Sequence, residues 1–284
     1  MIAETMNFTT DGRVKLQTFI HPDTKEEPLP AVIILPGGAY GFISEAEGAP
    51  VARHIFEKGF HTFVLHYSVG EYSEFPAPLL EVSRAIWEIR KRANDWGAQS
   101  DAIALMGFSA GAGISAMSAT QWNNLETARQ AGADTVEDIR PNAAVIGYGA
   151  ANNSKTIIGN PDICIPPILG KIARDKTPEL DVVNYVNKDT APMFIWHNRY
   201  DNYVPAINPI MMAEAMQKSD RPYELHIFQN GRHGMGIGKS GESEIALWNF
   251  DYINADLWFP MCVNWLRGLF GVEPRTHMES SDNK

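Results

Sequence analysis

The sequence has only two cysteines, no long apolar run and no extended basic segment. Cys164 and Cys262 form neither a CxxC pair nor a Cys/His ligand spacing, so we expect two buried thiols rather than a disulfide. No apolar run approaches the ~18 residues that a membrane-spanning helix needs. No two histidines stand at a ligand spacing with a carboxylate, and neither a GxGxxG motif nor a phosphate-binding loop is present. These absences argue against a metal site, a nucleotide cofactor and a membrane span.

Positive charge is also scarce. The 24 Lys and Arg residues are outnumbered by 34 Asp and Glu, which gives a formal net charge of −10. An acidic chain of this kind is repelled by nucleic-acid phosphates and by anionic lipid surfaces. Residues 1–7 lack the basic and apolar regions of a secretory signal peptide. We therefore expect a cytoplasmic protein with no cofactor, no nucleic-acid partner and no membrane partner, and the sequence leaves a homo-oligomer open.

What the chain does contain is a series of short apolar runs separated by helical patterns. Buried or alternating strand patterns occupy residues 14–20, 31–35, 61–65, 102–106, 143–146, 193–196 and 223–228. Helical spacing of apolar or small residues occupies 50–58, 79–94, 110–121, 207–218 and 257–269. This alternation predicts an α/β fold with a mostly parallel central sheet flanked by helices on both faces. We expect a single domain over 1–271, with 150–190 a loop-rich rim of a cleft and 272–284 a flexible tail.

The strongest motif is G-x-S-x-G at Gly107-Phe108-Ser109-Ala110-Gly111, between a predicted strand and a predicted helix. A nucleophile on a sharp strand-to-helix turn needs flanking glycines, because larger side chains would collide there. The helix that follows directs N–H groups and the positive end of its dipole towards a developing oxyanion. The motif predicts Ser109 as a nucleophile, and the alternative is a glycine-rich helix start packed on the sheet.

A nucleophilic serine needs a base and a carboxylate that orients the base. Asp201 lies in the loop after the predicted strand 193–196, and His233 lies between glycines after the predicted strand 223–228. Their order along the chain, Ser then Asp then His, is that of α/β-hydrolases. Asp189 or Asp220 could replace Asp201 as the acid. His197 competes with His233 as the base.

A glycine-rich turn after the strand 31–35 could supply the oxyanion hole. The residues Pro36-Gly37-Gly38-Ala39-Tyr40-Gly41 stand where this fold takes one donor from a loop of the HGGG type. Small residues let the backbone come close to a substrate oxygen. We predict the N–H groups of Gly38, Ala39 and Ala110 as the donors, and the alternative is a turn that merely leaves the strand.

These motifs resemble the α/β-hydrolase superfamily and, more narrowly, its carbohydrate-esterase-like branch of acetyl xylan esterases and sugar-ester hydrolases. The resemblance rests on 36–40, 45–52, 63–69, 76–86, the Ser109 turn, the Asp201 loop and 224–234, and it covers most of 30–270. Two positions depart from the HGGG pattern. Pro36 replaces its histidine, and Ala39 replaces its third glycine.

The resemblance implies a serine carboxylesterase that hydrolyses short-chain acyl esters, acetyl esters above all, of a sugar or oligosaccharide. Ser109 would form the acyl intermediate, His233 would act as base and then acid, and Asp201 would fix the histidine tautomer. The bulky Tyr40 and Phe42 beside the oxyanion turn favour a small acyl group. The alternatives are a prolyl-oligopeptidase-like serine peptidase and a catalytically silent ligand-binding homologue.

Overall fold

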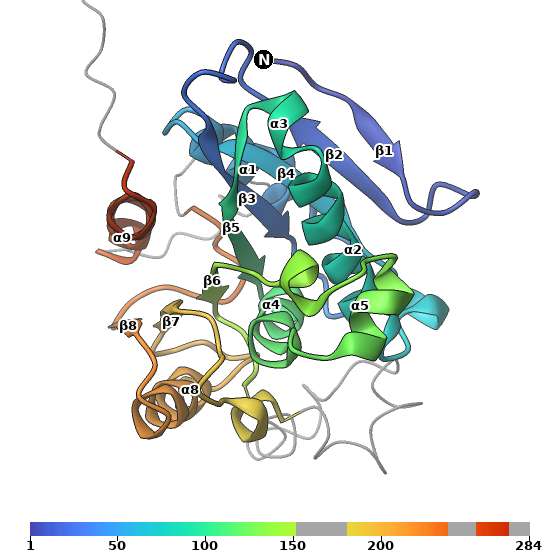
Figure 1. Ribbon diagram of the computed structural model, residues 1–284. Helices are drawn as coiled ribbons and strands as arrows, with labels where there is room; N and C mark the ends of the chain where they lie inside the picture. Colours follow the sequence, from blue (N-terminus) through green and yellow to red (C-terminus); the bar gives the residue numbers. More distant parts are fainter. Residues whose placement is uncertain (152–180, 238–253, 273–284) are drawn as a thin grey trace, which may run out of the picture.

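The computed structural model describes residues 1–151, 181–237 and 254–272 (Figure 1). Most of the predicted cleft rim at 150–190, Cys164 and nearly all of the predicted tail lie outside the described residues. Cys262 is a free, buried thiol, as the sequence predicts. No helix in the described part of the chain is long and apolar enough to cross a membrane.

The described residues build one eight-stranded sheet at the centre of the molecule. In spatial order its strands are β1 (Thr5–Asn7), β2 (Lys15–Phe19), β4 (His61–His66), β3 (Leu29–Leu35), β5 (Ala98–Phe108), β6 (Ala143–Gly147), β7 (Met193–Asn198) and β8 (Tyr223–Phe228). The pairs β1–β2 and β2–β4 are antiparallel, and every pair from β4 to β8 is parallel. The edge strand β8 carries a side-chain pair, Glu224 and His226, with Oε2 and Nε2 3.0 Å apart.

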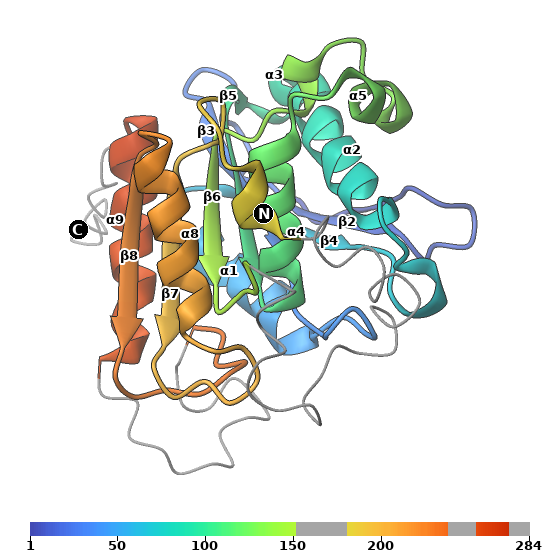
Figure 2. The ribbon, with the colours of Figure 1, turned by 90° about the horizontal axis from the view of Figure 1, so that it is seen from below.

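Helices cover both faces of this sheet (Figure 2). One buried cluster joins the sheet to α2 (Ala77–Lys91), α4 (Ala110–Gln121) and α8 (Ile207–Lys218). A second cluster, on the other face, joins it to α1 (Ala49–Phe56) and α9 (Trp258–Phe270). Neighbouring residues of a strand divide between the clusters, as Ile33 and Ile34 do, because successive side chains point to opposite faces. Burial on both faces explains why the parallel strands are continuous apolar runs. The predicted α/β fold with helices on both faces is confirmed.

The hydrophobic patterns of the sequence do not predict several short elements. They are α3 (Ala93–Trp96), α5 (Leu125–Ala131) and the 3₁₀ turns η1 (Glu45–Glu47), η2 (Gly70–Tyr72), η3 (Val136–Ile139), η6 (Val182–Tyr185) and η8 (Ala255–Leu257). The helix α5 is largely polar, and it is held by Asn124, whose Oδ1 accepts the N–H groups of Glu126 and Thr127. Strand β1 has three residues and pairs only with β2, so its pattern is too short to detect.

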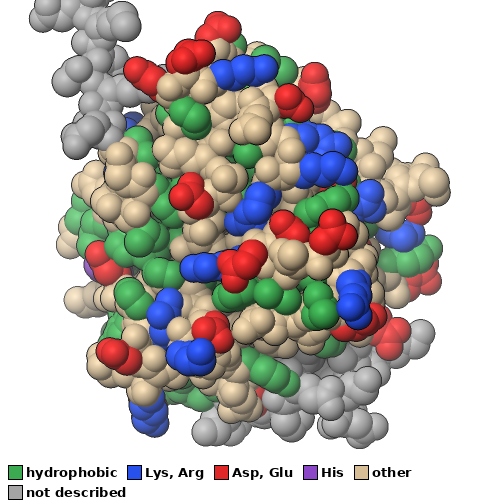
Figure 3. Space-filling model, viewed as in Figure 1, with side chains coloured by type: hydrophobic (Ala, Val, Ile, Leu, Met, Phe, Trp, Pro, Cys, Tyr) green, Lys and Arg blue, Asp and Glu red, His purple; other side chains and the backbone are tan. Residues whose placement is uncertain are grey.

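The order of the strands places a topological switch point at the centre of the sheet, where open α/β sheets form a ligand crevice. Strand β3 has β4 on one side and β5 on the other, so the chain leaves the carboxyl ends of β3 and β5 in opposite directions. Ligands of open α/β sheets bind at such a switch point. Ser109 follows β5 and the glycine-rich turn follows β3, so both lie at this crevice. The face seen in Figure 3 carries Lys and Arg side chains interspersed with Asp and Glu.

Arg90 joins α2 to the rim of the sheet opposite this crevice. Its guanidinium donates hydrogen bonds of 2.6–3.2 Å to the carbonyl oxygens of Ser100, Glu137, Asp138 and Arg140 and to Oδ1 of Asn142. Burial lowers the pKa of Arg90 to about 10, so the group is charged at neutral pH. One side chain thus satisfies backbone carbonyls at the start of β5, in η3 and in the turn before β6.

We expect Arg90→Ala to lower the free energy of unfolding by about 2–3 kcal/mol, because five acceptors, which are exposed or partly buried, lose a charged donor. Arg90→Lys should recover little of this loss, since a lysine ammonium cannot reproduce the planar fork of donors. Urea unfolding monitored by circular dichroism measures both values. Arg129→Ala, at an exposed arginine of α5, is the control and should change stability little. Equal losses for Arg90→Ala and Arg129→Ala would contradict the role given to Arg90.

Candidate active site

Ser109 occupies a strained turn between β5 and α4. Its φ of 52° and ψ of −116° place a non-glycine residue in a conformation that the surroundings must impose. A Cβ at Gly107 would lie 2.3 Å from the carbonyl oxygen of Gly111. A Cβ at Gly111 would lie 2.0 Å from the carbonyl oxygen of Leu35, at the end of β3. The two glycines of the motif are therefore required by backbone contact, as predicted for a nucleophile turn.

The structure brings Ser109, His233 and Asp201 into one hydrogen-bonded chain. Ser109 Oγ lies 2.7 Å from His233 Nε2, and His233 Nδ1 lies 2.7 Å from Asp201 Oδ2. An aspartate carboxylate accepts hydrogen bonds, so Nδ1 carries the proton of the neutral imidazole. Nε2 is then free to accept the serine hydroxyl. This is the arrangement that activates a serine for attack on a carbonyl carbon.

The Asp201 side chain is fully buried and fixed by its own loop. Its Oδ1 accepts the N–H groups of Tyr203 and Val204, both at 2.8 Å, which leaves Oδ2 for His233. The two alternative acids lie elsewhere. Asp189 Oδ2 accepts a hydrogen bond from the Asn123 side chain, and Asp220 lies in the turn after α8.

His197 lies behind the acid and does not contact Ser109. Its Nε2 donates to the carbonyl oxygen of Val204 at 2.8 Å and lies 3.5 Å from Asp201 Oδ2. Burial lowers the pKa of His197, so this imidazole is neutral at physiological pH. The structure thus brings His233, rather than the competing His197, to the serine, and His197 supports the loop that holds Asp201.

The loop that carries His233 is held at both ends. At its start Gly231 has a φ of 129°, and a Cβ there would lie 2.4 Å from Oδ1 of Asn198. The Asn198 side chain also donates a hydrogen bond to the carbonyl oxygen of Arg232 at 2.9 Å. Further along, Trp258 of α9 donates its indole N–H to the carbonyl oxygen of Gly236 at 3.0 Å. These contacts fix His233 above Ser109 from β7 and from α9.

The predicted oxyanion donors border the same serine. Ala110 is the first residue of α4, where an N–H has no acceptor within the helix. Gly38 has a φ of 129°, and Ala39 and Tyr40 have φ values of 52° and 59°. A Cβ at Gly38 would lie 1.9 Å from the carbonyl oxygen of Phe42, so only glycine fits there. The Gly38 carbonyl accepts the N–H groups of Gly41 and Phe42, and no backbone acceptor among the described residues takes the N–H of Gly38 or of Ala39.

Two further buried side chains belong to this site, and the sequence reasoning missed them. Glu47 accepts the N–H of Gly37 at 2.8 Å and the hydroxyl of Tyr148 at 2.5 Å. Burial and the charge of Glu47 raise the pKa of Tyr148 well above its ordinary value. Tyr148 directly follows β6, and the same rule that singled out residues at the carboxyl ends of strands could have found it. Glu47 lies within a stretch quoted for the resemblance, but no periodicity marks it.

Two exposed aromatic side chains flank the catalytic centre. Phe42, after the oxyanion turn, is 61% exposed, and Tyr203, beside the acid, is 59% exposed. The centroid of the Tyr203 ring lies 5.3 Å from that of His233.

Among the described residues no group of three His, Cys, Asp or Glu side chains could hold a metal ion.

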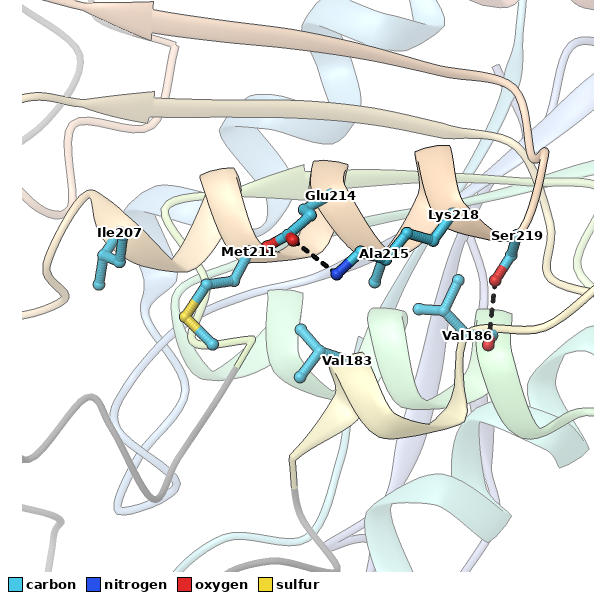
Figure 4. Close-up of a pocket in the computed structure, with 8 residues that line it drawn as sticks. All are labelled: Val183, Val186, Ile207, Met211, Glu214, Ala215, Lys218 and Ser219. Atoms are coloured by element: carbon cyan, nitrogen blue, oxygen red, sulfur yellow. Dashed lines mark hydrogen bonds and ion pairs between the residues drawn. The ribbon is translucent and has the colours of Figure 1, made fainter.

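A separate groove of about 570 Å³ lies between α8 and η6 (Figure 4). Val183, Val186 and Met211 line it, beside the ion pair between Glu214 and Lys218, whose charged atoms are 2.6 Å apart. None of its lining residues belongs to the hydrogen-bonded chain or to the oxyanion turn. It is therefore distinct from the site around Ser109.

Comparison with known sequences places this site in a family. Residues 18–216 match the BD-FAE family. The chain is 25% identical over 226 residues to endo-1,4-beta-xylanase B of Butyrivibrio fibrisolvens, a match over 78% of this chain and 34% of that protein. It is 22% identical over 245 residues to an acetylxylan esterase of Xylanibacter ruminicola, with 82% and 46% covered. The chain thus spans a third to a half of the length of these curated relatives.

Solved structures agree with this placement. An acetyl ester-xyloside bifunctional hydrolase from Caldicellulosiruptor lactoaceticus is 28% identical, with a TM-score of 0.71 over 91% of this chain and 89% of that one. The carboxylesterase Cest-2923 from Lactobacillus plantarum has the same fold, with a TM-score of 0.82 at 22% identity over 97% of this chain and all of that one. These matches confirm the predicted α/β-hydrolase fold. Because the family match spans most of the sequence, the chain belongs to the BD-FAE family within the α/β-hydrolase superfamily.

Proposed function

We propose that this chain is a serine carboxylesterase that removes short acyl groups, acetyl above all, from a sugar or oligosaccharide ester. The observation that carries the proposal is the chain of 2.7 Å contacts from Ser109 through His233 to Asp201 on a strained strand-to-helix turn. A hydroxyl held in that conformation, next to a base and to unused backbone N–H groups, has the parts that acyl transfer needs.

In the acylation step, Ser109 Oγ attacks the ester carbonyl carbon and its proton moves to His233 Nε2. The carbonyl oxygen becomes an oxyanion, which the N–H groups of Ala110 and Gly38, with that of Ala39 beside them, stabilise. Asp201 Oδ2 holds the Nδ1 proton and stabilises the imidazolium. The intermediate collapses as the C–O bond to the alcohol breaks, and His233 returns its proton to the leaving oxygen.

In the deacylation step a water molecule repeats this path on the acyl-serine. His233 Nε2 accepts one proton of the water while its oxygen attacks the acyl carbon. Collapse of the second intermediate breaks the bond to Ser109 Oγ, which recovers its proton from His233. The carboxylic acid leaves, and the protein is unchanged.

The surroundings of Ser109 support a small acyl group and a ring-shaped alcohol. The Tyr40 hydroxyl closely approaches Gly113, where an added Cβ would lie 2.8 Å from it, so the tyrosine packs on the first turn of α4, which directly follows the serine. Phe42 and Tyr203 offer exposed aromatic faces on which the apolar face of a sugar can pack. The named relatives include an acetylxylan esterase and an acetyl ester-xyloside hydrolase, which supports the same substrate class.

A fluorophosphonate probe tests the nucleophile. We expect it to label the wild type at Ser109 and to give no label in Ser109→Ala, because such probes react with a serine beside a base and an oxyanion hole. Peptide mass spectrometry locates the adduct. Ser219→Ala, at the end of α8, is the control and should label as the wild type does. A folded wild-type protein that takes up no probe would favour the catalytically silent alternative.

The acid is tested by Asp201→Asn. We expect kcat for p-nitrophenyl acetate to fall by roughly 10⁴ with little change in the circular dichroism spectrum, because the amide favours the wrong tautomer of His233. Asp189→Asn and Asp220→Asn remove the two alternative acids and should leave kcat within about twofold of wild type, as expected for residues outside the acid–base chain. If either control lost as much activity as Asp201→Asn, the assignment of the acid would be wrong.

The acyl group is tested with a chain-length series of p-nitrophenyl esters. Each buried CH₂ gains about 0.8 kcal/mol in a roomy apolar tunnel, so such a tunnel would make kcat/KM rise from acetate to octanoate. We expect the reverse, with acetate or butyrate preferred and octanoate poor, because the bulky Tyr40 packs on the first turn of α4, next to the nucleophile turn. Tyr40→Ala should shift the preference towards longer chains. A wild type that prefers octanoate would be lipase-like and would remove the physical support for a sugar-ester substrate.

A further inference from the structure

Glu47 is a buried carboxylate that has no role in the reaction steps above. The residue is 3% exposed, on the 3₁₀ turn η1 before α1. Burial of a carboxylate is costly unless its oxygens are hydrogen-bonded. Each oxygen here has one donor, the Gly37 N–H on Oε2 and the Tyr148 hydroxyl on Oε1. An apolar side chain at this position would avoid the free-energy cost of burying a carboxylate.

The first of these bonds holds the turn that carries the oxyanion donors. Gly37 directly precedes Gly38, so the bond from its N–H to Glu47 fixes the peptide plane at the start of that turn. From the other side, the Tyr67 hydroxyl donates to the carbonyl oxygen of Pro36 at 2.6 Å. A Cβ at Gly37 would lie 2.6 Å from Glu47 Oε2 and 3.0 Å from the Cβ of Ser109. The Glu47 carboxylate and the Ser109 side chain therefore both lie next to the Cα of Gly37.

The second bond leads to the loop of the base. Tyr148 donates its hydroxyl proton to Glu47 Oε1, and the phenol oxygen of Tyr148 accepts the N–H of Gly236 at 3.1 Å. Its raised pKa keeps the phenol protonated, as a donor to a carboxylate must be. The Tyr148 ring lies edge-on to the imidazole of His233, with centroids 5.0 Å apart and planes at 66°. Gly236 lies three residues after His233. Tyr148 therefore contacts the base loop twice, at the backbone of Gly236 and at the imidazole of His233.

We propose that Glu47 and Tyr148 are positioning residues that join the oxyanion turn to the base loop through a continuous relay, Gly37 N–H to Glu47 to Tyr148 to Gly236 N–H. The proposal rests on the proposed esterase function. The tetrahedral intermediate is held at its oxyanion by one loop and receives its proton from the other, so the distance between the loops must be fixed. The relay fixes it with four buried groups that touch no substrate.

Glu47→Gln and Tyr148→Phe test the relay, since each keeps the shape of the side chain. Glu47→Gln replaces one of the two acceptor oxygens, and Tyr148→Phe removes both bonds of the hydroxyl. We expect kcat for p-nitrophenyl acetate to fall on the order of 10- to 100-fold, less than the loss of an oxyanion donor. KM should change less than about threefold, because transition-state contacts rather than substrate binding are affected. The double variant should be no worse than the poorer single variant, since the two residues act as one unit. Thermal unfolding of each variant shows that it folds.

Glu81→Gln is the matched control. Glu81 on α2 is a partly buried carboxylate with the same kinds of bond, from the N–H and the hydroxyl of Ser68, at 2.7 and 2.5 Å. This variant should lose stability to a similar degree and keep kcat within about twofold, because its bonds join neither catalytic loop. If Glu47→Gln lowers kcat no more than Glu81→Gln does, while wild type is active, the relay is refuted and the esterase proposal stands.

A second readout does not need turnover. Amide hydrogen exchange in Tyr148→Phe should speed up at Gly236, which loses its acceptor, and also at Gly37, which keeps its own bond to Glu47. Faster exchange at Gly236 alone means that Tyr148 acts locally, and it overturns the coupling of the loops. If wild type neither hydrolyses esters nor takes up the fluorophosphonate, the esterase proposal fails. In that case the exchange rate at Gly37 in Tyr148→Phe still tests the coupling of the two loops. Faster exchange supports the coupling, and an unchanged rate refutes it.

Discussion

The backbone contact between the first turn of α4 and the end of β3 is the constraint on which the rest of the site depends. Gly111 comes so close to the carbonyl oxygen of Leu35 that no side chain fits between them. This contact forces Ser109 into its positive φ and sets α4 with its first N–H groups at the crevice. It also determines where the chain after Leu35 must turn, and so where the N–H groups of the oxyanion turn lie. The positions of the nucleophile and of the oxyanion donors thus both follow from this backbone contact.

The site also places two carboxylates in a core dominated by aromatic rings. Trp196 and Trp258 stack with centroids 4.5 Å apart, and Tyr148 lies edge-on to Trp196. In such surroundings an unsatisfied polar atom is expensive, so every bond to a carboxylate also specifies a position. Asp201 uses two backbone N–H groups and one imidazole, and Glu47 uses one backbone N–H and one phenol. These bonds therefore fix both carboxylates in single positions.

The parts that could be predicted from the sequence are those whose cause is local. The elbow at Ser109 is marked by glycines within two residues, and the strands by apolar runs of their own. Asp201 and His233 follow strands, and parallel strands bring their carboxyl ends to one edge. The relay could not be predicted in this way, because Glu47 and Tyr148 are 101 residues apart and their contact exists only after β6 and α1 have packed on the sheet. Strand β5 is likewise longer than its apolar run, since Ala98 pairs with Leu29 across a register shift.

The edges of the sheet have a consequence for assembly. A strand at an edge exposes unpaired N–H and C=O groups and can recruit a strand from another molecule. At one end of this sheet β1 has only three residues, and at the other β8 carries the paired Glu224 and His226. An incoming strand would gain few hydrogen bonds at the first edge and would have to accommodate the carboxylate–imidazole pair at the second. Both edges of the described sheet are therefore poor templates for pairing with a strand of another molecule.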